Sequence, residues 1–260
     1  MRDWFQSLPT AEAGVVMVGG FVLVALVVGY LVSKFTSREV RTAHNDRAGF
    51  IIAVIGVIYA VLLAFVAVGV WERFEQAEAR TYEEAASVAT IYRDSQSFPK
   101  TQPLRAMLRS YVQSVIVREW PQMRRGERSQ VSNALLERID ARVRALTAST
   151  LGLANVQAQM LAAADTAIAD REARLTIDSG GINGIMWTVL LVGAVVTVAF
   201  TYLFGFDRTL MQLLMVGCLS FLIGLVLFLV GSLDYPFRGS IAVEPDAFRA
   251  VLESFNGIAR

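Results

Sequence analysis

The chain contains very few of the side chains that bind transition metals or form disulfides. Its 260 residues include one histidine, His44, and one cysteine, Cys218. A structural zinc site takes about four such ligands, and an intrachain disulfide needs a second cysteine. The glycine-rich loops of P-loop and dinucleotide-binding proteins are also absent from the sequence. The sequence therefore predicts no enzyme and no resident cofactor or metal.

Charge is scarce as well. Charged residues make up 18% of the chain, against about a quarter in ordinary soluble domains. Hydrophobic residues make up 55%, and the formal net charge is only +1. A nearly neutral chain has no general electrostatic attraction for nucleic acid. The composition indicates a membrane protein whose main partner is the lipid bilayer, with no nucleic-acid partner.

Four uncharged runs are each long enough to cross a hydrocarbon core of about 30 Å as a helix. The first is interpreted as a retained span, because the N-terminus is only weakly basic, the run is long, and no small-residue cleavage site follows it. Glycines at 180 and 181 precede the third span. We therefore expect transmembrane helices at 13–33, 48–71, 182–206 and 209–233.

The segment 72–178 is predicted to be a bundle of helices that are apolar on one face and charged on the other. The second span is expected to continue into it as one long helix to about residue 97, and carboxylates such as Glu83 and Glu84 are expected on an exposed face. The tail, 234–260, contains a short amphipathic helix. The predicted fold is an all-α membrane protein with four transmembrane helices, two plus two, and an extramembrane helical bundle inserted between the second and third.

The second span has one face of small residues at steps of three and four. Such a face allows close helix packing, which we favour, or lines a narrow pore; side-by-side subunits around an axis would combine both roles. Its other side carries candidate residues for a hydrophobic gate: Ile55, Leu62 and Phe65. The small face consists of Gly49, Ala53, Gly56, Ala60, Ala64 and Ala67.

Polar residues mark the ends of the spans. His44, Asn45, Asp46 and Arg47 precede the second span and form either a helix cap, which we favour, or a proton-sensitive vestibule.

At the other membrane edges, Glu72 and Arg73 follow the second span and Asp234 follows the fourth. Glu75 and Glu78 follow Glu72, and we favour interpreting these carboxylates as a solvated helix face. On a conduction path they would suit cations and disfavour anions, unless they faced away from it or paired with arginines. Asp234 is expected to cap the turn or to accept a hydrogen bond from an arginine such as Arg238. Basic residues in the short connections number five on one side and four on the other, so they do not decide the orientation.

Several blocks of the sequence resemble the bacterial bestrophin-like-domain family of multi-pass membrane proteins. The resemblance extends over nearly the whole chain, and its first and last blocks are the most specific. The blocks are HNDRAGFIIAVIGVIYAVLLAFVAVGVWE, EAASVATIYRDS, REWPQM, FTYLFGFDRTLMQLLM and SLDYPFRGSIAVEPDAF.

This resemblance implies a distant relation to bestrophins, which are pentameric anion channels with a pore-lining second span. By that analogy the chain is expected to form a homo-oligomeric ion channel of the bacterial inner membrane, with inorganic ions as partners and with the helical domain and termini in the cytosol. The acidic calcium-binding cluster of bestrophins has no counterpart in the tail, where Glu244 and Asp246 offer only two neighbouring carboxylates. The alternative is a non-conducting membrane scaffold or regulatory protein whose helical domain binds a partner.

Overall fold

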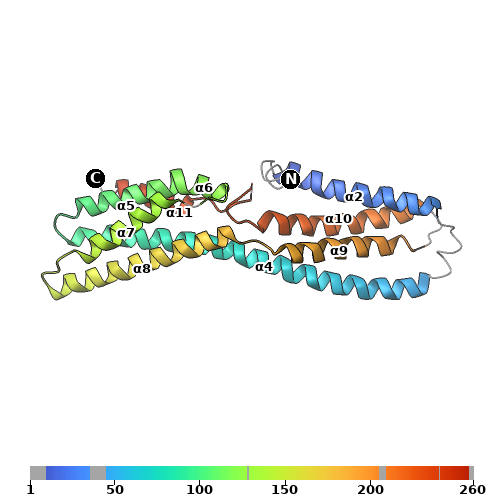
Figure 1. The fold of residues 1–260 in the computed structure, drawn as a ribbon, viewed down its shortest axis with the longest axis horizontal. Coiled ribbons are helices and arrows are strands. Elements are labelled where there is room, and N and C mark those ends of the chain that lie inside the picture. Colours follow the sequence, from blue (N-terminus) through green and yellow to red (C-terminus); the bar gives the residue numbers. More distant parts are fainter. Residues whose placement is uncertain (1–9, 36–44, 128, 205–208, 240, 258–260) are drawn as a thin grey trace. The chain divides into compact units, whose positions relative to one another are not determined.

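The computed structural model describes residues 10–35, 45–127, 129–204, 209–239 and 241–257, and all regular secondary structure in these ranges is helical (Figure 1). The elements in chain order are α2 (Thr10–Phe35), α4 (Asn45–Asp94), η1 (Ser95–Ser97), α5 (Gln102–Ser114), η2 (Val115–Glu119), α6 (Trp120–Arg124), α7 (Gln130–Arg144), α8 (Leu151–Ser179), α9 (Gly184–Thr201), α10 (Thr209–Leu233) and α11 (Asp246–Gly257).

The helices divide into two compact units, and each is described by itself. The apolar unit falls within residues 1–72, 182–234 and 239–241, and it contains α2, α9, α10 and the first part of α4. The bundle unit falls within residues 73–181, 235–238 and 242–260. Helix α4 contributes residues to both.

Four helices of the described chain are long and apolar enough to cross a membrane. Their most apolar windows have mean hydropathies between 2.1 and 3.0. The α-helix of the second one begins at Asn45 and ends at Asp94, after which a single 3-10 turn continues to Ser97. The candidate spans are Ala11–Phe35, Gly49–Ser97, Gly184–Thr201 and Thr209–Leu233.

Tyrosines held against glycines join the helices of the apolar unit. The Tyr59 ring of α4 lies so close to Gly193 of α9 that a Cβ at Gly193 would be 2.5 Å from it, and the Tyr59 hydroxyl donates to the Leu190 carbonyl at 3.1 Å. Tyr202, directly after α9, packs against α2 in the same way. Its ring lies 3.1 Å from the position that a Cβ at Gly29 would take, and its hydroxyl donates to the Ala25 carbonyl. The latter hydrogen bond is 2.9 Å long. Small residues allow this approach between apolar helices.

Helix α2 packs along α10, and large side chains again meet small ones at the contact. A Cβ placed at Gly14 would lie 3.2 Å from Phe228, and a Cβ placed at Gly224 would lie 3.3 Å from Val18. Between helices whose outer surfaces are as apolar as their inner ones, close packing of this kind supplies much of the association energy.

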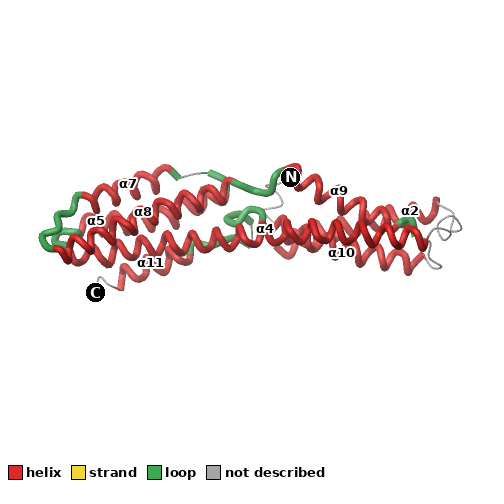
Figure 2. Tube along the Cα trace, turned by 90° about the horizontal axis from the view of Figure 1, so that it is seen from below, coloured by secondary structure: helices red, strands yellow, loops and turns green. Residues whose placement is uncertain are grey.

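The bundle unit has a conventional apolar core. Helix α5 packs on α7, α7 packs on α8, and α11 packs on α5, as Figure 2 shows from a second direction. Pro103 lies in the first turn of α5, where its missing N–H is not needed. The C-terminal segment belongs to this core, because Phe237, Phe248 and Phe255 are at most 1% exposed.

We expect Gly193→Ala to destabilise the apolar unit. The added methyl would lie 2.5 Å from the Tyr59 ring, and overpacking of this kind costs about 1–3 kcal/mol. Thermal unfolding of the purified protein in detergent measures the change. Gly19→Ala in α2 is the matched control, because a Cβ there meets nothing within 4 Å. Equal midpoints for the two variants would contradict the proposed Tyr59–Gly193 packing.

Candidate functional site

Helix α4 buries one face in the apolar unit and leaves three of the six residues of its small face exposed. Tyr59, Leu63 and Val70 are at most 7% exposed. Ala53, Ala60 and Ala64 are exposed, and a Cβ at Gly56 would meet no atom within 4 Å. Gly49 and Ala67 are half-buried; the one neighbour found for a Cβ at Gly49 is the Phe204 ring at 3.9 Å. In the described chain, the small face is therefore not where α4 packs on α9.

The three candidate gate residues do not share one surface. Ile55 and Leu62 are half-buried and line a groove between α4 and α9. Phe65 is 74% exposed and is not among the residues of that groove. The structure thus divides a set that helical spacing alone had grouped.

The polar entrance of α4 is only partly described. His44 lies outside the described residues, as do the side chains of Asn45, Asp46 and Arg47, although α4 begins at Asn45. The cap and vestibule hypotheses for these four residues stay predictions.

The other membrane-edge residues have defined surroundings. Glu72 is exposed. Arg73 donates a long hydrogen bond of 3.5 Å to the Ile177 carbonyl in the last turn of α8, where a cation is favourable.

Asp234 connects two helices of the apolar unit through its carboxylate. Its carboxylate accepts hydrogen bonds from the Ile182 N–H at 2.6 Å and from the Trp187 indole N–H at 3.3 Å. It thereby ties the end of α10 to the start of α9. Arg238, the partner considered from sequence, instead donates to the Asp178 carbonyl at 3.1 Å.

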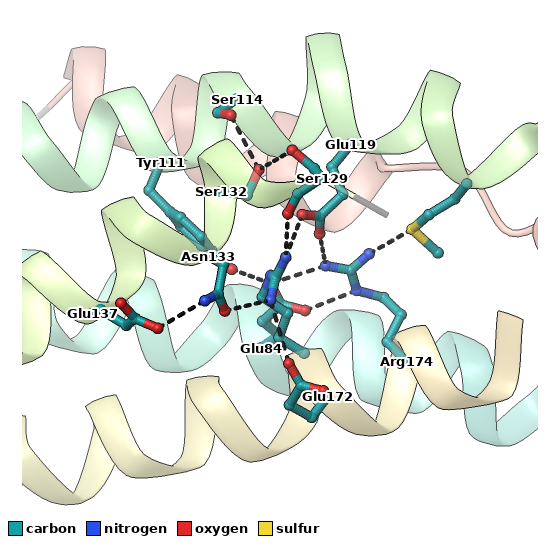
Figure 3. A network of polar contacts seen from close by, with 12 residues as sticks. Glu84, Tyr111, Ser114, Glu119, Ser129, Ser132, Asn133, Glu137, Glu172 and Arg174 are labelled. Carbon is teal, nitrogen blue, oxygen red and sulfur yellow. Dashed lines mark hydrogen bonds and ion pairs between the residues drawn. The ribbon is translucent and has the colours of Figure 1, made fainter. Parts of the chain in front are cut away.

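Several buried charged side chains form a hydrogen-bonded charge cluster in the core of the bundle unit (Figure 3). Arg174 of α8 binds Glu84 of α4 through Nε at 2.8 Å and Glu119 of η2 through an Nη at 2.6 Å. All three side chains are fully buried. The expectation that Glu84 lies on an exposed helix face is therefore wrong: it points into the bundle, where Arg174 and Tyr111 satisfy it.

Arg171 extends the charge cluster toward α7. It donates to Glu119 at 2.8 Å, to the Ser129 carbonyl at 3.0 Å and to the Asn133 side chain at 3.0 Å. Glu119 is the last residue of a five-residue π-helix, Val115–Glu119. A π-helical turn changes the direction in which following side chains project, and such turns are frequent at functional positions.

Aromatic side chains also pack against the charge cluster. The Arg174 guanidinium carbon lies 4.9 Å from the Trp120 ring centroid and 5.9 Å from that of Phe248, within cation–π range. The Trp120 indole donates to the Val243 carbonyl at 3.0 Å. The C-terminal segment is thus joined to the buried charges through Phe248 and Val243.

The electrostatics of the cluster favour charged arginines and a charged Glu119. Burial opposes the charge on Glu119 most strongly, yet Arg174 and Arg171 together lower its pKa below the ordinary value. Burial raises the pKa of Glu84, against the opposing attraction of Arg174. The pKa of Tyr111 is raised by burial and by the neighbouring Glu84, so Tyr111 remains a neutral donor. Arg174 binds both Glu84 and Glu119, and Arg171 also binds Glu119, so the cluster holds α4, η2 and α8 together.

A periodicity signal for this cluster exists in the sequence. Glu84 lies seven residues after Ala77 and four before Val88, both buried, so it falls on the apolar stripe of α4. Arg171 and Arg174 follow the buried Ala164 and Ala167 by seven residues each. A charge on an apolar stripe indicates a buried ion pair, but the sequence does not show which residues pair.

Comparison with known proteins defines the family. The bestrophin-like domain matches residues 19–248, which is most of the chain. The chain belongs to the bestrophin-like family. No curated protein matches it.

Solved structures show the same fold. This bestrophin-like chain is similar to crystal structures of a bacterial bestrophin homologue from Klebsiella pneumoniae. Two single-mutant forms match with TM-scores of 0.70 and 0.69 at 12% identity, covering 93% and 92% of this chain and 98% and 99% of theirs. A third structure of the homologue matches with a TM-score of 0.62 at 13% identity, covering 91% of this chain and 97% of that one.

We expect Arg174→Met to destabilise the bundle unit strongly. The substitution leaves Glu84 and Glu119 buried without their shared partner, and breaking a buried ion pair costs about 3–5 kcal/mol. Denaturant unfolding of the full-length protein in detergent measures the loss. Adding Glu84→Gln to Arg174→Met should recover part of it, because one uncompensated charge is removed.

Arg144→Met is the matched control for that substitution. Arg144 pairs with Asp140 and Asp165 at the surface, where ion pairs contribute little, so its unfolding midpoint should stay close to the wild type. If Arg174→Met were as mild as Arg144→Met, the cluster would not be the anchor of the bundle unit.

Proposed function

We propose that this chain forms a homo-oligomeric ion channel of the bacterial inner membrane, with α4 nearest the conduction path. Family membership and the shared fold support the channel class. The observation that carries the role of α4 is its small, exposed surface: Ala53, Ala60 and Ala64 are exposed in the single chain. Most of this part of α4 is exposed as well, and only the side that carries Tyr59, Leu63 and Val70 is buried. Side-by-side copies would bring these faces together around an axis.

Several finer features belong to the same proposal. The four candidate spans cross the bilayer as two plus two, with the bundle unit outside it between the second and third. Conduction of anions and a pentameric assembly follow from the family analogy, as does a cytosolic location of the bundle unit and the termini. A reporter fused after Arg260 tests the orientation, since its activity depends on the side of the membrane.

Ion flux through proteoliposomes and planar-bilayer recording of the wild type test conduction directly. We expect Ala60→Trp to reduce ion flux by at least about tenfold. An indole ring on the small face would narrow a pore along it, and ion passage depends on the pore diameter. Val61→Trp is the matched control: Val61 is the next residue, also exposed, and points about 100° away around the helix. Equal flux in the two variants would argue against a path along the small face.

The second candidate function is a non-conducting scaffold whose bundle unit binds a partner. An open groove of about 600 Å³ between α5, α7 and α11 favours it, since Val117 and Val131 on its wall are 69% and 46% exposed. Absence of wild-type conductance across varied pH, calcium and voltage would support the scaffold and overturn the channel.

A further inference from the structure

The apolar unit has a groove on its outer surface, between α4 and α9. Its volume is about 420 Å³, within the range of small-molecule sites. It is open along one side, and its exposed surface is almost wholly apolar. The principal lining residues are Ile55, Tyr59 and Leu62 from α4, and Val189, Val192 and Val196 from α9.

The hydroxyl groups beside the groove are all satisfied by the chain itself. Tyr59 donates to the Leu190 carbonyl at 3.1 Å. Thr188 donates to the Gly184 carbonyl at 2.9 Å, and Thr197 donates to the Gly193 carbonyl at 2.7 Å. No charged side chain is among the lining residues. The groove therefore offers no free donor that would hold a headgroup, an ion or a water molecule.

The position of the groove along the helices indicates what surrounds it. Residues 55–62 lie in the middle of the uncharged run 48–71, and residues 188–197 lie in the middle of α9 (Gly184–Thr201). When both helices cross a bilayer, the groove lies near its midplane. Only the distal parts of lipid acyl chains reach that depth, because the headgroups lie about 15 Å away on either side.

The shape of the groove suits a linear hydrocarbon. At 1.5 Å per residue, its walls extend about 12 Å along α4 and about 15 Å along α9. Gly193 allows the Tyr59 ring to lie directly against α9, so this ring forms part of the floor of the groove. An elongated apolar slot that runs along the helices accommodates a chain of methylenes better than a ring system.

We propose that this groove binds the distal part of a phospholipid acyl chain from the surrounding bilayer. The proposal rests on α4 and α9 crossing a bilayer, which is part of the proposed function, but it does not require conduction. Ile55 and Leu62, considered above as gate residues, would then contact the lipid chain.

Photolabelling tests the proposal with two synthetic phosphatidylcholines. One carries a diazirine at the end of an acyl chain, and the other carries it next to the glycerol ester. The full-length protein is reconstituted with each lipid, irradiated and digested, and the adducts are located by mass spectrometry. We expect the chain-end probe to label the groove-lining residues within 55–62 and 188–197, and the ester-proximal probe to leave them largely unlabelled.

Two substitutions on the same helix provide the matched comparison. Val192→Phe fills the groove, whereas Val195→Phe places the same ring at an exposed position of α9 that does not line it. Groove labelling should fall about tenfold in Val192→Phe, because losing contact with about two buried methylenes corresponds to that factor. It should be unchanged in Val195→Phe. Val189→Phe is a second groove-filling variant if Val192→Phe fails to reconstitute.

Three results would overturn the proposal. The first is uniform labelling of α9 that neither groove-filling variant changes. The second is labelling of the exposed positions of α9 with none in the groove, which would mean that another molecule, such as a second copy of the chain, fills it. The third is no chain-end labelling of α9 at all; this would contradict the bilayer crossing itself and is thereby distinguishable from failure of the groove alone.

Discussion

A buried polar group must find a partner within the chain, and much of this structure follows from that constraint. In the bundle unit it acts on charges: Glu84 and Glu119 are fully buried because Arg174 and Arg171 are buried with them. In the apolar unit it acts on hydroxyls, where Tyr59 and Tyr202 donate to backbone carbonyls of neighbouring helices. Polar contacts of this kind fix a particular pairing of helices, because apolar surfaces alone allow many.

Helix α4 is the element on which both forms of the constraint act. Its first part is attached to α9 through Tyr59, and its second part is attached to α8 and η2 through Glu84. One continuous helix therefore carries an anchor in each unit.

The C-terminal segment depends on the same cluster. Phe248 and Trp120 lie against Arg174, and Phe255 stacks on Tyr92 of α4 with ring centroids 3.8 Å apart. Arg109 adds a hydrogen bond to the Phe255 carbonyl at 2.9 Å. The segment that follows the last candidate span is thus part of the bundle core, and it completes the enclosure of the buried charges.

The sequence by itself determined the helical class, the four apolar helices and the family, because these depend on local composition and on residues that are contiguous in the chain. It also identified Asp234 as a residue at the end of α10, although not its partners. Only the tertiary structure decided that Glu84 is buried, that Ile55 and Leu62 face α9 while Phe65 does not, and that three of the six residues of the small face of α4 are exposed. Helical periodicity defines which residues share a face, but which face is buried depends on neighbours distant in sequence. The partners of Glu84, Tyr111 and Arg174, lie 27 and 90 residues away along the chain, so no local pattern could have paired them.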